Sequence, residues 1–233
     1  MQSTPYSRSM VYMHISKSSG IFSILKGILL FWTMSVNTSR KRGRSLVNEL
    51  VDGTVLYHGS YCAVHEPDLA KCAKYKDFGQ GFYLTTDIEQ ARSFAKISLR
   101  HALDSGNVNP NQKFGVVSSF LFSRNGEILE KNFPVADVSW LHCVVGHRRK
   151  SSFEDVVLEC QKYDIIGGKI ANDATNLTIA AYMLGAYGAV GSKEADDLCI
   201  SLLIPERLKN QYCFRTSRSI LCLDFQKEER VWL

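Results

Sequence analysis

The clearest hydrophobic pattern in the chain lies between residues 82 and 102. Apolar residues recur there at helical spacing, as Ile88, Ala91, Phe94, Ala95 and Ala102. This period predicts an amphipathic helix with one buried face. Thr86, with Glu89 three residues later, fits a capping box at the helix start. The preceding residues 82–84, Phe-Tyr-Leu, predict a short buried strand.

The rest of the chain alternates between strand and helix signals. Strands are predicted over residues 54–58, 114–122, 163–170, 211–215 and 219–225, with an Asn-Gly turn at residues 125–126. Helices are predicted over residues 174–184 and 193–203, the second ended by Pro205. Residues 139–147 fit either a helix or a strand. The absence of repeats and linkers after residue 45 predicts one α+β domain over residues 46–233.

Residues 1–45 form a separate N-terminal extension in this interpretation. Its stretch 20–36 is apolar but contains Lys26, and the basic run 40–44 follows. One alternative is a signal peptide, but the small-residue cleavage site expected of one is missing. Another is a membrane anchor, but a stretch of this length is at the short end for a membrane span. The third alternative, which we favour, is that Met34 is the natural start and that the preceding residues are not native.

Composition changes this picture in two ways. The net charge of +5 comes from the extension, because residues 1–45 contain seven basic and no acidic side chains, which leaves −2 on the remainder. The domain therefore gives no strong signal for nucleic-acid binding. Seven cysteines without framework spacing predict reduced thiols in a cytoplasmic protein. His142, Cys143 and His147 lack the paired spacing of a zinc site, so no metal is predicted.

Two short stretches suggest a ligand site. Residues 56–60 read Leu-Tyr-His-Gly-Ser, and residues 77–87 read Asp-Phe-Gly-Gln-Gly-Phe-Tyr-Leu-Thr-Thr-Asp. Gly79 and Gly81 lack a β-carbon, which lets backbone amides approach a bound molecule. The resulting hypothesis is a flat heteroaromatic ring held between Tyr83 and Phe94, with His58 hydrogen-bonded to a hydroxyl group.

These stretches resemble the histidine-tyrosine-glutamate class of ADP-ribosyltransferases, which includes poly(ADP-ribose) polymerases and diphtheria-type toxins. Together with Tyr-Asp-Ile-Ile-Gly-Gly-Lys-Ile-Ala-Asn-Asp at residues 163–173 and Asn-Gln-Tyr-Cys-Phe-Arg-Thr at residues 210–216, they more specifically resemble a bacterial family of small, uncharacterised ADP-ribosyltransferase-like proteins. The resemblance covers about residues 50–225. It implies a split antiparallel β-sandwich with flanking helices and NAD in the cleft between the sheets.

The resemblance also implies a role for each motif residue. His58 and Ser60 would hold the adenine-side ribose of NAD, and the Gly59 backbone would pair with the nicotinamide carboxamide. Tyr83 and Phe94 would enclose the nicotinamide ring. Gln211 occupies the position where the class has a glutamate, and an amide supplies only a dipole against the cation-like sugar of the transition state. Slower chemistry, or transfer of a single ADP-ribose unit, is therefore expected.

Each of these residues also has a structural interpretation. His58 could be a satisfied strand-end histidine, Tyr83 and Phe94 could be core aromatics, and Gln211 could be an exposed strand residue. Asp173 fits a helix cap better than a site acid.

The function predicted from the resemblance is NAD-dependent mono-ADP-ribosylation of a macromolecular acceptor in the cytoplasm, with NAD as substrate. A toxin with a small antitoxin partner would fit the resemblance, and membrane association is not expected. The alternatives are a module that binds NAD or ADP-ribose without turnover, an NAD glycohydrolase, and a structural domain.

Overall fold

The computed structural model describes residues 49–170, 173–204 and 208–233. The extension up to residue 45, including Met34, and Pro205 lie outside these residues. Contacts divide the chain into two compact units, Met1–Gly43 and Arg44–Leu233, and every element below belongs to the second. Its strands are β1 (Val55–Ser60), β2 (Phe82–Leu84), β3 (Phe114–Phe122), β4 (Glu130–Asn132), β5 (Ile165–Lys169), β6 (Asn210–Phe214) and β7 (Leu223–Trp232). Its helices are the 3-10 turn η2 (Leu69–Lys71), α2 (Ile88–Asp104), α3 (Val138–Arg148), α4 (Glu154–Cys160), α5 (Asp173–Met183), α6 (Lys193–Leu203) and α7 (Ser217–Ile220).

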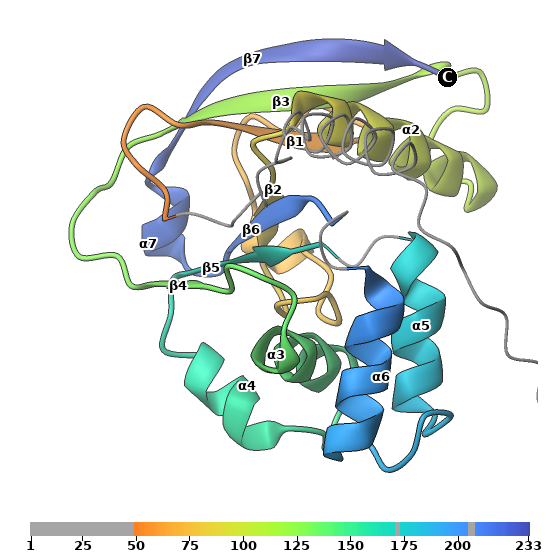
Figure 1. Ribbon diagram of the computed structural model, residues 1–233. Helices are drawn as coiled ribbons and strands as arrows, with labels where there is room; N and C mark the ends of the chain where they lie inside the picture. Colours follow the sequence, from red (N-terminus) through yellow and green to blue (C-terminus); the bar gives the residue numbers. More distant parts are fainter. Residues whose placement is uncertain (1–48, 171–172, 205–207) are drawn as a thin grey trace, which may run out of the picture. The chain divides into compact units, whose positions relative to one another are not determined.

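Two sheets form the centre of the domain (Figure 1). The first has three antiparallel strands in the order β1-β3-β7, and the second has four strands in the order β2-β6-β5-β4. The α+β prediction is confirmed. The strand pairs are antiparallel, as the resemblance implies, except that β4 runs parallel to β5. The connection between them contains α3 and α4, and a parallel pair needs such a long crossover.

The two sheets meet where β1 passes β2. The N–H of Tyr57 donates to the carbonyl oxygen of Thr85 at 2.8 Å, and the N–H of Thr85 donates back to Tyr57 at 3.0 Å. Within the described residues this bridge is isolated, so β1 and β2 do not continue as a ladder. Beyond Tyr57, β1 still pairs with β3 on one side, but its opposite edge has no partner strand among the described residues.

Apolar side chains form three layers of core around these sheets. One cluster lies between the sheets and joins Leu56 and Phe120 of the first sheet to Phe82 of the second. A second, around Trp140, lies between the second sheet and helices α3, α5 and α6. A third lies under α2, which runs alongside β1 and β3 of the first sheet in Figure 1. Burial of these side chains is the main favourable contribution to folding.

Local hydrogen bonds explain where the predicted elements shift. Strands β2 and β3 and helix α6 have the predicted bounds, and the ambiguous residues 139–147 form helix α3. The predicted cap Thr86 is wrong by one residue, because the Asp87 carboxylate accepts from the N–H groups of Glu89 and Gln90. The predicted strand over 219–225 is wrong at its start, where Thr216 and Ser219 form a capping box that begins the short helix α7.

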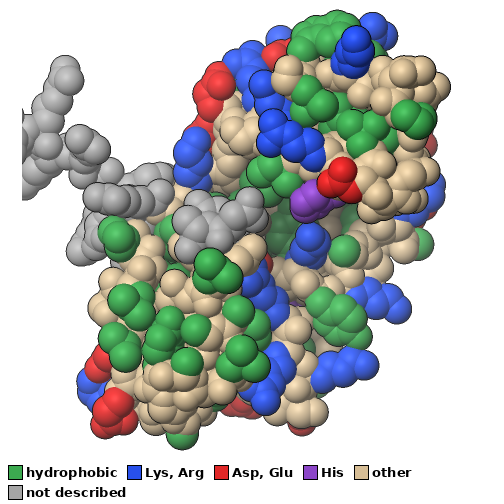
Figure 2. Space-filling view, turned by 90° about the vertical axis from the view of Figure 1, so that its right-hand side faces the viewer, with side chains coloured by type: hydrophobic (Ala, Val, Ile, Leu, Met, Phe, Trp, Pro, Cys, Tyr) green, Lys and Arg blue, Asp and Glu red, His purple; other side chains and the backbone are tan. Residues whose placement is uncertain are grey.

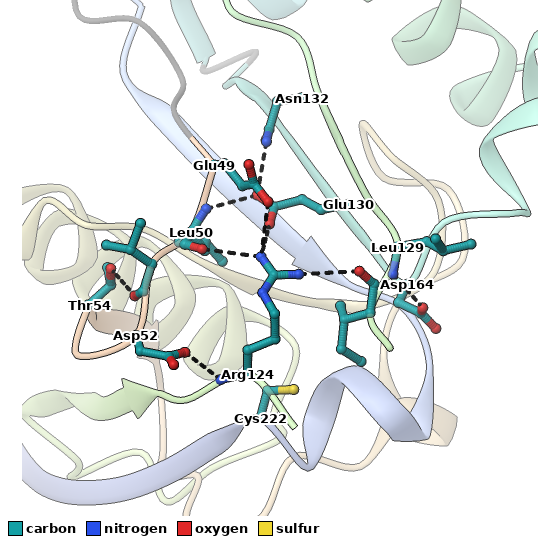
Figure 3. A network of polar contacts seen from close by, with 12 residues as sticks. Glu49, Leu50, Asp52, Thr54, Arg124, Leu129, Glu130, Asn132, Asp164 and Cys222 are labelled. Carbon is teal, nitrogen blue, oxygen red and sulfur yellow. Dashed lines mark hydrogen bonds and ion pairs between the residues drawn. The ribbon is translucent and has the colours of Figure 1, made fainter. Parts of the chain in front are cut away.

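A network around Arg124 joins the first described residues to the sheets (Figure 3). The Arg124 guanidinium contacts the carboxylates of Glu49 and Glu130, and donates to the carbonyl oxygens of Leu50 and Ile128. The N–H of Leu50 in turn donates to Glu130 at 3.0 Å. Residues 49–54 are thereby held against the β3–β4 connection.

All seven cysteines are free thiols, as their scattered spacing predicts. None of the helices in the described ranges combines the length and the apolar character that a membrane span requires.

Candidate functional site

The free edge of β1 carries an unused backbone donor and acceptor. Successive residues of an antiparallel pair direct their backbone groups alternately toward and away from the partner. Tyr57 uses its outward groups on Thr85, so Gly59, two residues further, also directs its N–H and C=O away from β3. The next outward N–H, of Tyr61, donates to the Ser98 hydroxyl at 3.1 Å. No hydrogen bond to the outward groups of Gly59 comes from a described residue.

The missing side chain of Gly59 has a separate cause. A β-carbon at this position would lie 2.0 Å from the Ala91 carbonyl oxygen and 2.8 Å from the Ala95 nitrogen. Glycine is therefore required here by the close packing of α2 on β1. The helix fills the space beside the Gly59 α-carbon, and the accessibility of its backbone groups to a ligand stays a prediction.

The turn before β2 is closed by Tyr83. The Tyr83 hydroxyl donates to the Gly79 carbonyl oxygen at 2.8 Å and accepts from the N–H of Phe78 at 2.9 Å. Burial, with Cys213 and Asp77 nearby, raises the pKa of this hydroxyl well above its usual value, so it remains protonated as a donor. The half-buried Tyr83 thus fixes the turn that carries Asp77.

Gly79 and Gly81 also have structural causes. Gly79 has a φ of +80°, and a β-carbon there would lie 2.7 Å from the His147 ring. At Gly81 it would lie 2.4 Å from the Cys213 sulfur. Neighbouring side chains occupy the space beside both α-carbons, so packing alone accounts for these glycines, and the approach of their backbone amides to a ligand stays a prediction.

His58 is held in a defined orientation. Its Nδ1 lies 2.9 Å from the Tyr83 carbonyl oxygen, and its ring lies 4.4 Å from that of Phe82. A carbonyl only accepts, so Nδ1 carries the proton and Nε2 of the neutral ring is an acceptor. Burial lowers the pKa of His58, and the hydrogen bond to Tyr83 partly opposes this. Ser60, two residues along β1, lies on the same face of the strand.

Gln211 is buried rather than exposed, with 5% of its surface accessible. Its Nε2 donates to the Asp77 carboxylate at 2.7 Å and lies 3.4 Å from the Lys169 carbonyl oxygen. The other Asp77 oxygen accepts from Arg148, whose Nη1 donates to Asn176 at 2.9 Å. The structural interpretation of Gln211 as an exposed strand residue is therefore wrong.

Tyr83 and Gln211 lie on one face of the second sheet. Tyr83 pairs directly with Cys213, and Gln211 is two residues from Cys213 on β6. Side chains two residues apart on a strand share a face. The fold therefore brings Gln211 close to Tyr83 and to the turn that Tyr83 closes, although these residues are far apart in the sequence.

Phe94 lies on the part of α2 that follows the free edge of β1. Its helix contacts Gly59 through Ala91 and Tyr61 through Ser98, on either side of Phe94. Phe94 is 37% exposed, so it is not a core aromatic. Among described residues no ring contact joins it to Tyr83, and their roles as a ligand clamp stay a prediction.

Sequence reasoning gave no role to Asp77, Arg148 or Lys169. Asp77 is the first residue of the motif at residues 77–87, and this position could have indicated a role in the site. No motif includes Arg148, which lies at the end of α3. Lys169 is buried, which lowers the pKa of its ammonium group, and its Nζ donates to Asn210 at 2.8 Å. The side chain of Asp173 is outside the described ones.

Figure 2 shows a hollow at the centre of one face of the molecule. Hydrophobic side chains lie on its floor, and Lys or Arg side chains, a histidine and an acidic side chain lie at its edge. Such a surface suits a ligand with both flat apolar and negatively charged parts.

The fold is an α+β domain that contains a free strand edge at Gly59 and a buried polar cluster of Asp77, Arg148 and Gln211. The sequence profile of a family described as "Protein of unknown function (DUF3990)" matches residues 54–225. The chain belongs to this family, and the matched range includes β1, the turn before β2 and β6. A search of curated proteins found no match.

Proposed function

We propose that this protein is an NAD-dependent mono-ADP-ribosyltransferase that modifies a macromolecular target. The observation that carries the proposal is the outward N–H and C=O of Gly59 on the free edge of β1. A carboxamide has both a donor and an acceptor, so a backbone pair of this kind suits the amide of nicotinamide. The surrounding motifs resemble those of ADP-ribosyltransferases, and this resemblance is the reason to propose NAD as the ligand.

The neighbouring side chains suit the rest of the dinucleotide. Neutral His58 offers Nε2 as an acceptor for a ribose hydroxyl, and Ser60 lies on the same face of β1. Phe94 has a partly exposed ring on the helix that packs on β1, and Tyr83 lies on the sheet face that also carries Gln211. Aromatic faces are suited to stacking on the flat base of a nucleotide.

The proposed reaction breaks the bond between ribose C1′ and the nicotinamide nitrogen. The electron pair leaves with neutral nicotinamide, while the acceptor's nucleophilic atom bonds to C1′ and releases its proton to solvent. Gln211 would accept a hydrogen bond from a ribose hydroxyl as positive charge develops on the sugar. The small antitoxin partner and the cytoplasmic location belong to the same proposal, the latter because NAD is intracellular.

A second candidate is a module that binds NAD or ADP-ribose without turnover. The specific observation in its favour is the neutral amide of Gln211 at the position where the resembling enzymes have a glutamate. An amide can hold a hydroxyl, but it does not supply a full negative charge to the sugar.

Full-length protein incubated with cell lysate and NAD labelled in its adenylate phosphate separates these functions. A transferase produces labelled macromolecules, a glycohydrolase produces free labelled ADP-ribose, and a binding module leaves NAD intact while giving heat on titration. We expect labelled macromolecules, and heat-denatured protein is the control. Absence of both turnover and binding heat would refute every NAD-based function.

A further inference from the structure

The orientation of the Gln211 side chain is fixed by its neighbours. Both groups within hydrogen-bond distance of Nε2, the Asp77 carboxylate and the Lys169 carbonyl, are acceptors only. The amide nitrogen must therefore face them, and Oε1 points to the other side. No described residue donates a hydrogen bond to Oε1, so this oxygen is available to a bound hydroxyl group.

Asp77 also brings a full charge into direct contact with the amide. Its side chain is 9% exposed, and the Arg148 guanidinium binds its other oxygen. The Arg148 guanidinium places a positive charge against this carboxylate in its partly buried place. The Oδ2 atom that faces Gln211 remains the negatively charged partner of the amide, and such a bond polarises the amide so that Oε1 becomes a stronger acceptor.

We propose that Asp77 is a positioning residue for Gln211, fixing the side-chain amide with Oε1 toward the substrate and supplying the negative charge that the amide lacks. The inference rests on the proposed NAD chemistry, because the charge acts on the cation-like ribose. In the resembling enzymes one glutamate both holds the hydroxyl and supplies the charge. Here Gln211 of β6 would hold the hydroxyl, and Asp77 of the turn closed by Tyr83 would supply the charge.

The variant Gln211→Glu tests the contact without any substrate. It places two carboxyl groups within hydrogen-bond distance, and such a pair retains one proton above the ordinary glutamate pKa of about 4.3. The folded pKa is raised, so the stabilisation is present at acid pH and is lost as pH rises through that raised value. We expect the melting temperature of Gln211→Glu, relative to wild type, to fall with rising pH. In the Asp77→Asn background this extra pH dependence should disappear.

The exchange of the two groups tests the role in catalysis. With NAD as the probe, release of nicotinamide by full-length Asp77→Asn should be about tenfold or more slower than by wild type, mainly in kcat. The double variant Asp77→Asn/Gln211→Glu restores one carboxylate and one amide in contact, and should recover most of the rate. Asp196→Asn, a buried aspartate bound to Tyr182 and His142, is the control for lost stability alone.

The outcomes separate the two proposals. A wild type that neither binds NAD nor releases nicotinamide refutes the proposed function and this inference with it. An active wild type whose Asp77→Asn variant keeps its rate, or whose double variant is as slow as Asp77→Asn, refutes the inference alone. If Asp77→Asn does not fold, the pH dependence of Gln211→Glu decides: a profile parallel to that of wild type overturns the proposed contact.

Discussion

The protonation state of His58 depends on its neighbour in β2 and on burial. The Nδ1 of His58 is hydrogen-bonded to the Tyr83 carbonyl, and burial favours the neutral ring. A protonated ring would have no acceptor to offer a ribose hydroxyl, since both nitrogens would be donors. The chemistry of this residue is therefore set by its neighbour on β2.

Stability should fall at acid pH in a way that depends on His58. Its folded pKa is lowered, so its contribution is present above the unfolded pKa of about 6.5 and is lost as pH falls toward the lower folded value. We expect His58→Gln to flatten the dependence of the unfolding free energy on pH below about 6.5 in denaturant titrations. His101→Gln, on the exposed end of α2, is the control and should follow wild type.

Phe94 allows the ligand clamp to be tested without disturbing the core. Because its ring is partly exposed, Phe94→Ala should leave the melting temperature nearly unchanged and weaken NAD binding by about 1 to 3 kcal/mol, measured by calorimetry. Tyr83→Ala is less informative, since it also removes two hydrogen bonds from the turn. Leu158→Ala, an exposed apolar residue of α4, is the matched control. Unaltered affinity in Phe94→Ala would place the ring outside the site.

At the scale of elements, the position of α2 depends on glycines in the sheet below it. The α2 backbone lies so close to β1 and β3 that β-carbons at Gly59 and Gly115 would contact the carbonyl oxygens of Ala91 and Ala95 at 2.0 and 2.4 Å. The small residues Ala91 and Ala95 complete this close approach. The helix thereby follows the strand edge that carries the proposed carboxamide contact.

Gly59→Ala should separate the helix from the strand. The added methyl group meets backbone atoms that cannot rotate away, so the free energy of unfolding should decrease by about 1 to 3 kcal/mol. Chemical denaturation measures this change, and NAD binding should weaken as the edge is displaced. Arg100→Ala on the exposed side of α2 should change stability by less than about 0.5 kcal/mol. A fully stable Gly59→Ala protein would contradict the packing of α2 described above.

At the scale of the whole molecule, the three core clusters found among the described residues lie in the second unit. A chain that starts at Met34 should therefore melt at the same temperature as the full chain and bind NAD equally well. A chain that starts at Val55 lacks Leu50, which is 3% exposed in the inter-sheet core and bonded to Glu130. This shorter chain should melt at a lower temperature. Loss of folding in the chain from Met34 would show that residues 1–33 contribute to the domain.

The local pattern of the sequence determined most of the elements. Strands β2 and β3 and helix α6 have the predicted bounds because hydrophobic period and turn residues are local signals. Helix α7 was missed because its capping box competes with a strand-like composition. The parallel pairing of β4 with β5 depends on a contact across a long crossover, which no local pattern contains.

For the candidate site, the sequence alone determined which residue types are present, namely His58, Tyr83 and the glutamine at position 211. Only the tertiary structure decided how they are connected. The hydrogen bond from Gln211 to Asp77 joins residues 134 positions apart, and Arg148 comes from a third element. Periodicity records which side chains are buried along an element. The partner of a buried polar group is chosen by the packing of distant elements, since each such group must find its hydrogen bond wherever the fold supplies one.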